Sequence, residues 1–209
     1  MPLIRYILLF ISLLSFNYVA AQVSFGLKGG VNLAQQNIQD IGLDIDSDEI
    51  TGYNLGGFLE VPIGNGNIYF QPEILFIQKG GSLSLNVADI RTTINYIDVP
   101  ILLKLKIINS NLFNVNVLGG PSFGYATNGE EAENGTIINL NFGEDNIKRF
   151  DVGIHAGAGL GLELGSVALI GDVRYLFGLS DLDGSDRAIK NRGILLSAGL
   201  QFRILGRKY

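Results

Sequence analysis

The chain has 209 residues, a length that suits one domain. It has no cysteine, which excludes disulfides, a thiolate zinc site and a lipidated cysteine. Its net charge of −5 argues against a nucleic-acid partner, because phosphate binding needs clustered Lys and Arg. Only 17% of the residues are charged, whereas a soluble domain usually has about a quarter. We therefore expect part of the surface to face something other than water.

The first residues have the layout of a secretory signal peptide. Arg5 supplies a positive charge, Tyr6–Leu14 is a short apolar run, and Val19–Ala21 provides small residues before a cleavage point at Gln22. The apolar run is shorter than the ~20 residues of a spanning helix. The sequence thus predicts a signal peptide over residues 1–21 and one domain over 22–209. Because no later run reaches ~18 apolar residues, a membrane crossing would have to use strands.

Eight segments alternate apolar and polar residues with the period of two that a β-strand requires. These segments are Val23–Leu33, Gly52–Val61, Ile68–Lys79, Thr93–Lys106, Leu112–Tyr125, Phe150–Leu164, Val167–Leu179 and Gly193–Ile204. Each has about ten residues or more, which is the length that a tilted strand needs to cross a bilayer. Pro72, Pro100 and Pro121 lie within them. Because proline removes a donor from the ladder, we expect bulges or irregularities at these positions.

The connectors between the segments alternate between long and short. The long ones are Gln35–Thr51, Gly80–Thr92, Ala126–Lys148 and Asp181–Arg192, and the short ones are Ile63–Asn67, Ile107–Asn111 and Gly165–Ser166. Tight turns at one end and long loops at the other are typical of outer-membrane barrels. The sequence predicts an all-β fold, an eight-stranded antiparallel up-and-down transmembrane β-barrel. We expect a monomer in the cell outer membrane, with both termini periplasmic and long acidic loops outside.

Aromatic residues of the apolar face gather near both ends of the predicted strands. Toward the short connectors lie Phe25, Phe70, Phe113 and Phe202, and toward the long ones lie Tyr53, Phe76, Phe123, Tyr125, Phe150, Tyr175 and Phe177. Amphipathic rings form such belts at the two boundaries between lipid and water. We therefore expect outer-membrane lipid to be the partner of the apolar face.

The ionisable residues of the opposite face balance in charge. The basic set is Lys28, Lys79, Lys104, Lys106, Arg174 and Arg203, and the acidic set is Glu60, Glu73, Asp98, Asp151, Glu163 and Asp172. An eight-stranded barrel is only wide enough to be filled by its own side chains, and buried charges must pair. The pattern predicts a plugged, ion-paired interior and disfavours a wide pore. The alternative is a soluble sandwich in which these residues face water.

A few residues offer candidate chemistry. His155, the single histidine, and Ser122 are predicted to share the inner face of neighbouring strands, either as parts of a catalytic site or as interior hydrogen-bonding groups. The acidic runs Asp44–Glu49 and Asp181–Asp186 lack the complete ligand set of a calcium loop. Gly157–Gly161 does not complete a nucleotide fingerprint. We therefore predict no catalytic, cofactor-binding or metal-binding residue, no cofactor and no enzymatic activity.

Four strand motifs bear a family resemblance. Phe25–Leu33 (FGLKGGVNL), Tyr69–Phe76 (YFQPEILF), Ile97–Lys104 (IDVPILLK) and Phe150–Leu160 (FDVGIHAGAGL) resemble strands of the PorT-like outer-membrane β-barrel family of Bacteroidetes. The resemblance implies an eight-stranded barrel in the outer membrane and carries no catalytic residue with it. The founding member of that family is linked to protein secretion. The family pattern leaves Phe202 and Tyr209 as alternatives for the assembly signal.

These observations lead to one expected function and two alternatives. We expect an integral outer-membrane protein with a structural or interaction role and with a possible protein partner at its extracellular loops. The first alternative is an accessory to protein secretion across the outer membrane. The second is a lipid-modifying outer-membrane enzyme that uses His155.

Overall fold

A computed structural model describes residues 23–40, 43–64, 66–85, 88–133, 136–142, 147–183 and 188–204. The predicted signal peptide over residues 1–21 and the candidate assembly residue Tyr209 lie outside these ranges. Among the described residues, no helix is both long and apolar enough to cross a membrane.

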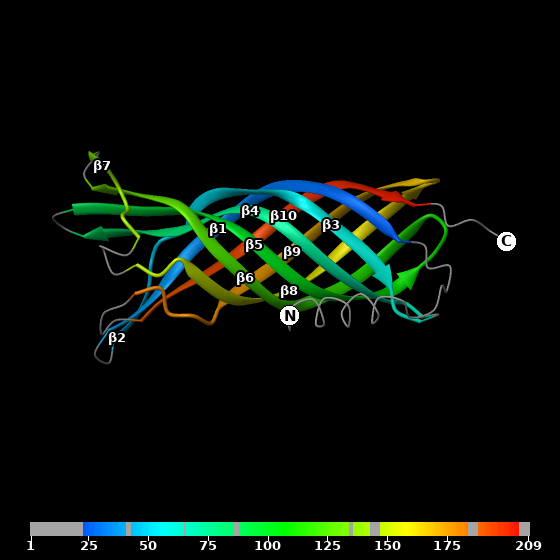
Figure 1. Ribbon diagram of the computed structural model, residues 1–209, viewed down its shortest axis with the longest axis horizontal. Coiled ribbons are helices and arrows are strands. Elements are labelled where there is room, and N and C mark those ends of the chain that lie inside the picture. Colours follow the sequence, from blue (N-terminus) through cyan, green and yellow to red (C-terminus); the bar gives the residue numbers. More distant parts are fainter. Residues whose placement is uncertain are drawn as a thin grey trace, which may run out of the picture.

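Within the described residues, eight long strands form one closed antiparallel barrel, as the sequence predicted (Figure 1). They are β1 (Ser24–Asp40), β3 (Ile50–Pro62), β4 (Ile68–Leu85), β5 (Ala88–Asn109), β6 (Phe113–Glu133), β8 (Phe150–Leu164), β9 (Val167–Gly178) and β10 (Ala188–Arg203). Each strand pairs with its neighbours in chain order, and β1 pairs with β10 to close the ring. The short strands β2 (Leu43–Asp46) and β7 (Thr136–Asn139) pair with β1 and β6 beyond the closed part.

The alternating sequence sets which side chains point outward. On β1, Leu27 is 62% exposed, whereas its neighbour Lys28 is 3% exposed. The same contrast between exposed apolar and buried polar residues recurs on the other seven long strands. Successive side chains of a strand must point to opposite faces, so a register error of one residue would turn the charges outward. The predicted assignment of faces is confirmed.

The three prolines lie at local irregularities of the ladders, as the sequence predicted, and none of them produces a bulge. The ladder between β4 and β5 omits two pairs after Pro72 and then resumes in the same register, and the ladder between β5 and β6 does the same after Pro100. Pro121 lies in this same gap on its β5 side, whereas its ladder with β8 is continuous. The register shifts on β5 lie at Asn95–Tyr96 and Lys106–Ile108 instead. Losing a donor thus interrupts the pairing locally, while the need to keep charges inside preserves the register.

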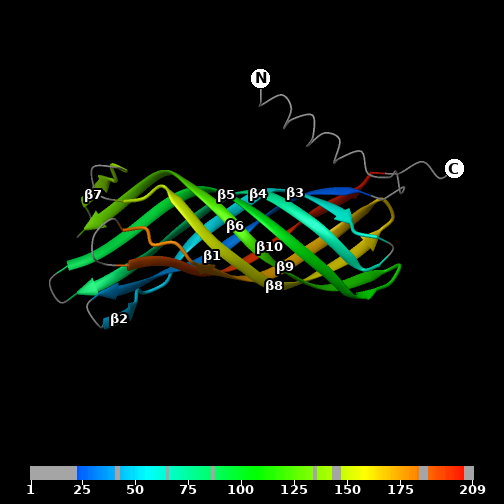
Figure 2. The same ribbon diagram turned by 60° about the horizontal axis from the view of Figure 1, so that its bottom comes forward.

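The strands extend farther than predicted at the end with the long connectors (Figures 1 and 2). Most of the predicted connector Gly80–Thr92 is a ladder in which β4 and β5 pair as far as Leu85 and Ala88. β6 continues to Glu133, with β7 returning along it, and β1 continues to Asp40. On β6 the apolar alternation has ended by Thr127, yet the backbone groups beyond it still pair with β5. At the other end, Gly64 and Gly165 have φ of 65° and 76°, a conformation that glycine adopts readily in tight turns.

The exposed aromatic residues form the two predicted belts. Toward the short turns, the rings of Phe25 and Phe202 stack with centroids 5.2 Å apart. Toward the long connectors, Tyr125 meets Phe150 at 5.2 Å and Tyr175 meets Phe177 at 4.3 Å. Between the belts the outer wall is apolar. The exposed large residues of this wall include Leu27, Leu55, Ile74, Leu103, Leu160, Leu169, Val173, Leu196 and Leu200.

This outer wall generates a first prediction. Val173 lies near the middle of β9 and is 47% exposed on the outer wall. Replacing it with lysine places a charge in hydrocarbon, and we expect a loss of about 2–4 kcal/mol in the free energy of unfolding from liposomes. The matched control is Ile137→Lys on β7, which is 66% exposed but lies beyond the barrel. Denaturant titrations that show equal losses for both variants would contradict a lipid-facing wall.

Candidate functional site

The inner face of the barrel gathers every ionisable residue that the sequence assigned to it. Each of the six predicted cations forms an ion pair with one or more of the six predicted anions. Most of them form three clusters. Along β4 the order from the short-turn end is Tyr69, Glu73 and Lys79, one residue from each cluster, so the clusters lie one after another along the barrel. The Arg203–Glu163 pair lies at the short-turn end.

The first cluster, which we call the Glu60 cluster, lies nearest the short turns. The Nζ atoms of Lys104 and Lys106 each donate to Glu60 at 2.8 Å, and Gln201 Nε2 donates to the same carboxylate at 3.1 Å. Lys106 Nζ also lies 4.0 Å from the centroid of the Tyr69 ring, in cation–π geometry. Two lysines against one carboxylate leave this cluster with one net positive charge.

The second cluster, the Glu73 cluster, is electrically neutral. Glu73 accepts hydrogen bonds from Lys28 Nζ at 2.8 Å, from Arg174 Nη1 and Nη2 at 2.8 and 2.9 Å, and from Gln71 Nε2 at 2.6 Å. Asp172 lies 2.8 Å from Arg174 Nε and 3.6 Å from Lys28 Nζ. The bidentate contact fixes the guanidinium plane, which a lysine in its place could not do.

Glycines on β8 make room for this cluster and its neighbours. A Cβ at Gly157 would lie 2.9 Å from Arg174 Cγ and 2.2 Å from the carbonyl oxygen of Val173. A Cβ at Gly161 would lie 2.3 Å from the amide nitrogen of Asn114. The bare face of β8 therefore lets long polar side chains from β6 and β9 cross the interior. This run is a paired strand, so it has no nucleotide-binding loop geometry.

The third cluster, the Asp98 cluster, has more acid than base. Lys79 Nζ lies 3.4 Å from Asp98 and 3.0 Å from Asp151. Asn191 Nδ2 donates to Asp151 at 2.9 Å. His155 Nε2 lies 3.3 Å from Asp98 Oδ2 without the alignment of a hydrogen bond. The lysine and two carboxylates leave one net negative charge when His155 is neutral, so the ends of the interior carry opposite net charges.

His155 and Ser122 do not assemble a nucleophile and its base. They lie on the facing strands β8 and β6, where His155 pairs with Gly120 and Ser122 pairs with Gly153. Both side chains are buried, and the Ser122 hydroxyl makes no hydrogen bond. A catalytic pair needs direct contact and a path to substrate. In this interior, His155 instead packs beside the carboxylate of Asp98.

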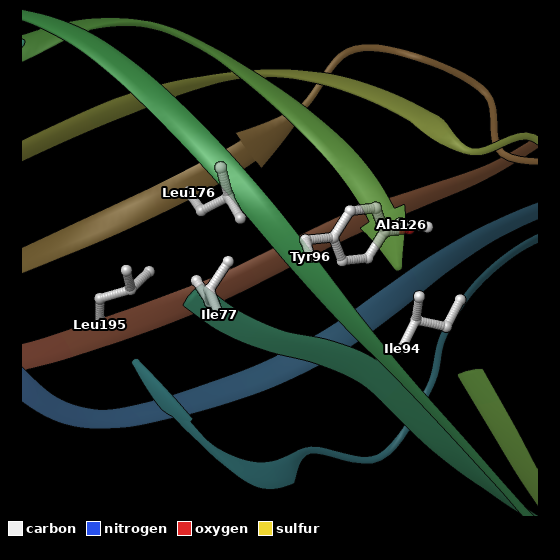
Figure 3. Packing of buried hydrophobic residues seen from close by; sticks show 6 residues of the cluster. All are labelled: Ile77, Ile94, Tyr96, Ala126, Leu176 and Leu195. Atoms are coloured by element: carbon white, nitrogen blue, oxygen red, sulfur yellow. The ribbon is translucent and has the colours of Figure 1, made fainter. Parts of the chain in front are cut away.

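An apolar layer beside the Asp98 cluster was missed in the sequence. Its buried members are Ile77, Ile94, Tyr96, Ala126, Leu176 and Leu195, which converge from five strands (Figure 3). Leu140 and Phe142, which follow β7, pack against the same layer. The sequence feature that could have predicted this layer is the set of apolar residues at inward positions near the long-connector ends of the strands. Their effect is to exclude water from that part of the interior.

The described members of the acidic runs at the rim form ion pairs. Asp46 lies 3.4 Å from Arg192, and Asp181 lies 3.1 Å from Lys148. Burial alone would raise the pKa of Asp181, but hydrogen bonds from the Ile189 backbone N–H, Lys148 and the Asp183 backbone hold that pKa below its usual value. Over the part of the chain that the structure describes, no three metal-ligating side chains gather. The side chain of Asp44 and residues 184–187 lie outside that part.

Comparisons with known proteins agree with this architecture. The profile of a family described as "Outer membrane protein beta-barrel domain" matches residues 16–184. Neisserial surface protein A is 10% identical with a TM-score of 0.51, covering 86% of this chain and 97% of its own. A major outer membrane protein from Thermus thermophilus is 10% identical with a TM-score of 0.50, covering 87% and 99%. Ail of Yersinia pestis is 19% identical with a TM-score of 0.45, covering 87% and 99%. No curated protein matches the chain significantly.

The Glu73 cluster generates the second prediction. In a Glu73→Gln variant, Lys28 and Arg174 keep only Asp172 as an opposing charge, so a buried positive charge is left uncompensated. We expect a loss of about 3–5 kcal/mol in the free energy of unfolding, measured by urea titration in liposomes. The control is Asp181→Asn, which breaks the exposed pair with Lys148 and should cost less than about 1 kcal/mol. Equal losses of unfolding free energy in the two variants would show that the Glu73 cluster remains accessible to water.

Proposed function

Since the chain belongs to the outer membrane protein beta-barrel domain family, we propose that it is a non-conducting anchor in the outer membrane that presents an interaction surface beyond the bilayer. Its compartment, the outer membrane, follows from the family and from the shared fold. The signal peptide over residues 1–21 belongs to this proposal, because the domain must be exported before it reaches that membrane.

The single observation that carries the proposal is the filled interior. The three clusters and the apolar layer occupy successive parts of the barrel, and their side chains are buried. An ion that crossed would have to separate the pairs around Glu60, Glu73 and Asp98 in turn. Eight strands leave an interior just wide enough for side chains. We therefore interpret the barrel as plugged by its own residues.

The interaction surface is proposed at the long-connector end. There β4, β5 and β6 extend past the aromatic belt, and β7 adds a strand whose residues are exposed. Ile137 and Ile138 on β7 are 66% and 55% exposed, although they lie beyond the lipid-facing wall. Contiguous exposed apolar patches outside the membrane mark sites where a protein partner binds, and we propose that these two side chains contribute to such a patch. We assign this end to the cell exterior and the short turns to the periplasm, as in other outer-membrane barrels.

The PorT-like relationship is also a proposal. Its support is that the charged members of the four motifs all take part in the interior clusters; these are Lys28, Glu73, Asp98, Lys104 and Asp151. An accessory role in protein secretion is the alternative function that this relationship carries. Lipid modification by His155 gains no support, since that side chain is buried away from lipid.

The third prediction concerns conductance. Purified protein in planar bilayers should give no large, stable currents, because the interior ion pairs leave no continuous aqueous path. A known outer-membrane porin inserted under the same conditions is the positive control. Long-lived open-channel currents from the wild-type protein would overturn the non-conducting anchor while leaving the barrel fold intact.

The fourth prediction concerns orientation, and the absence of natural cysteine makes it accessible. Asn139→Cys on β7 should react with a membrane-impermeant maleimide on intact cells. Ser166→Cys in the turn between β8 and β9 should react only after the outer membrane has been permeabilised. Both positions are exposed, so their intrinsic reactivities should be similar. The opposite labelling order would place the proposed interaction surface in the periplasm.

A further inference from the structure

A small polar cavity lies inside the barrel between the Glu60 and Glu73 clusters. Its volume is about 10 Å³, and its lining comes from β4, β5, β6, β8, β9 and β10. The polar lining residues that matter here are Gln71, Lys104, Asn116 and Asp172. Bare backbone at Gly159 and Gly171 forms part of the wall. The cavity therefore adjoins both charge clusters.

Two buried amide oxygens at this cavity accept no hydrogen bond, whereas the lining carboxylate of Asp172 is paired with Arg174. They are Oε1 of Gln71, whose side chain is 2% exposed, and Oδ1 of Asn116, whose side chain is 4% exposed. An unsatisfied buried acceptor costs about 1–3 kcal/mol. Two such acceptors at one cavity call for a ligand that can donate two hydrogen bonds.

The orientation of both amides is fixed by carboxylates, so these atoms are oxygens. Gln71 must present its nitrogen to Glu73, since a carboxylate only accepts. Asn114 likewise presents its nitrogen to Glu163 at 3.1 Å, which leaves its oxygen to accept from the nitrogen of Asn116 at 3.0 Å. Reversing either amide would set oxygen against oxygen. The two unsatisfied atoms are therefore acceptors.

Charge then selects the class of ligand. A cation is disfavoured, because the adjoining Glu60 cluster already carries a net positive charge and the Glu73 cluster is neutral. An anion is disfavoured, because the amide oxygens repel it. Lys104 Nζ, which donates to Glu60, has further N–H groups available for a neutral acceptor. The ligand must be small, neutral, and both donor and acceptor.

We propose that this cavity binds one structural water molecule that donates to Gln71 Oε1 and Asn116 Oδ1 and accepts from Lys104 Nζ. A cavity of about 10 Å³ has the space that one water needs. Three hydrogen bonds are also the usual number for a buried water. The water joins the Glu60 and Glu73 clusters into one network, and the inference therefore deepens the proposed closed interior.

Gly159→Ala provides the test variant. The new Cβ would lie 2.9 Å from Asn116 Oδ1, at the end of a flexible side chain, and would occupy part of the cavity. The matched control is Ser122→Ala. It removes a buried hydroxyl that also makes no hydrogen bond, at a position that does not line the cavity. A second variant, Asn116→Leu, removes one acceptor at nearly constant shape, in case the alanine disturbs folding.

The measurement is crystallography at a resolution that shows ordered waters, combined with magnetic relaxation dispersion of water protons and deuterons in the same proteins. We expect one water peak within hydrogen-bonding distance of Gln71 Oε1 and Asn116 Oδ1 in the wild type and in Ser122→Ala. Gly159→Ala and Asn116→Leu should each lose that peak and one long-lived water from the dispersion amplitude. An empty cavity in the wild type, density that refines as a cation, or a water that persists in both variants would overturn the proposal.

Conductance distinguishes this inference from the proposed function. A wild-type protein that holds the water but conducts would contradict the non-conducting anchor alone. A wild-type protein that gives no current and whose cavity holds no water would contradict the water site alone.

Discussion

The pairing of β1 with β10 is the interaction on which the rest of the structure depends. From Ser24–Arg203 to Gln39–Ala188 the two terminal strands form an unbroken antiparallel ladder. In hydrocarbon no water can satisfy an open sheet edge, so a sheet survives there only when it closes on itself. Closure also separates an inside from an outside, and the period of two along each strand then decides which side chains meet lipid.

The charged interior follows from that separation. Lys28 on β1 and Glu73 on β4 both point into the closed barrel. Neither side chain could turn outward without placing its charge in lipid. Their contacts with Arg174 and Asp172 compensate for the loss of water around each charge. The bare face of β8 is the spatial complement of these long side chains, since a Cβ at Gly157 would overlap them. Charge pairing and glycine placement therefore form one packing solution.

Much of this arrangement was predictable from the sequence, because a strand in a membrane has strict periodicity. The bounds of β8 match the predicted Phe150–Leu164, and the inward assignments of Lys79, Asp151 and His155 are confirmed. The extent of β6 beyond the belts was not predictable in this way, because Thr127–Glu133 shows no apolar alternation although it pairs with β5. On β4 the alternation continues through Ser82–Leu85, yet this stretch was predicted as a connector.

The particular ion-pair partners in the interior could not be predicted from the sequence either. Balanced charges predicted pairing, but the particular pairs depend on strand stagger, which brings Arg174 of β9 across the barrel to Glu73 of β4. The prolines illustrate the same point, because local loss of a donor predicted bulges or irregularities, and the global register limited these to short gaps in the pairing. The apolar layer around Tyr96 was missed since its members are ordinary apolar residues at inward positions.

The central claim is that adjacent residues of one strand lie in different media, with hydrocarbon outside and a sealed polar network inside. Nuclear Overhauser contacts in lipid nanodiscs test it most directly at Leu27 and Lys28 of β1. The methyl groups of Leu27 should show contacts to lipid acyl chains and none to water, whereas the side chain of Lys28 should show contacts to neither lipid nor bulk water. Water contacts at the Leu27 methyl groups, or rapid solvent exchange at the Lys28 ammonium, would contradict the account.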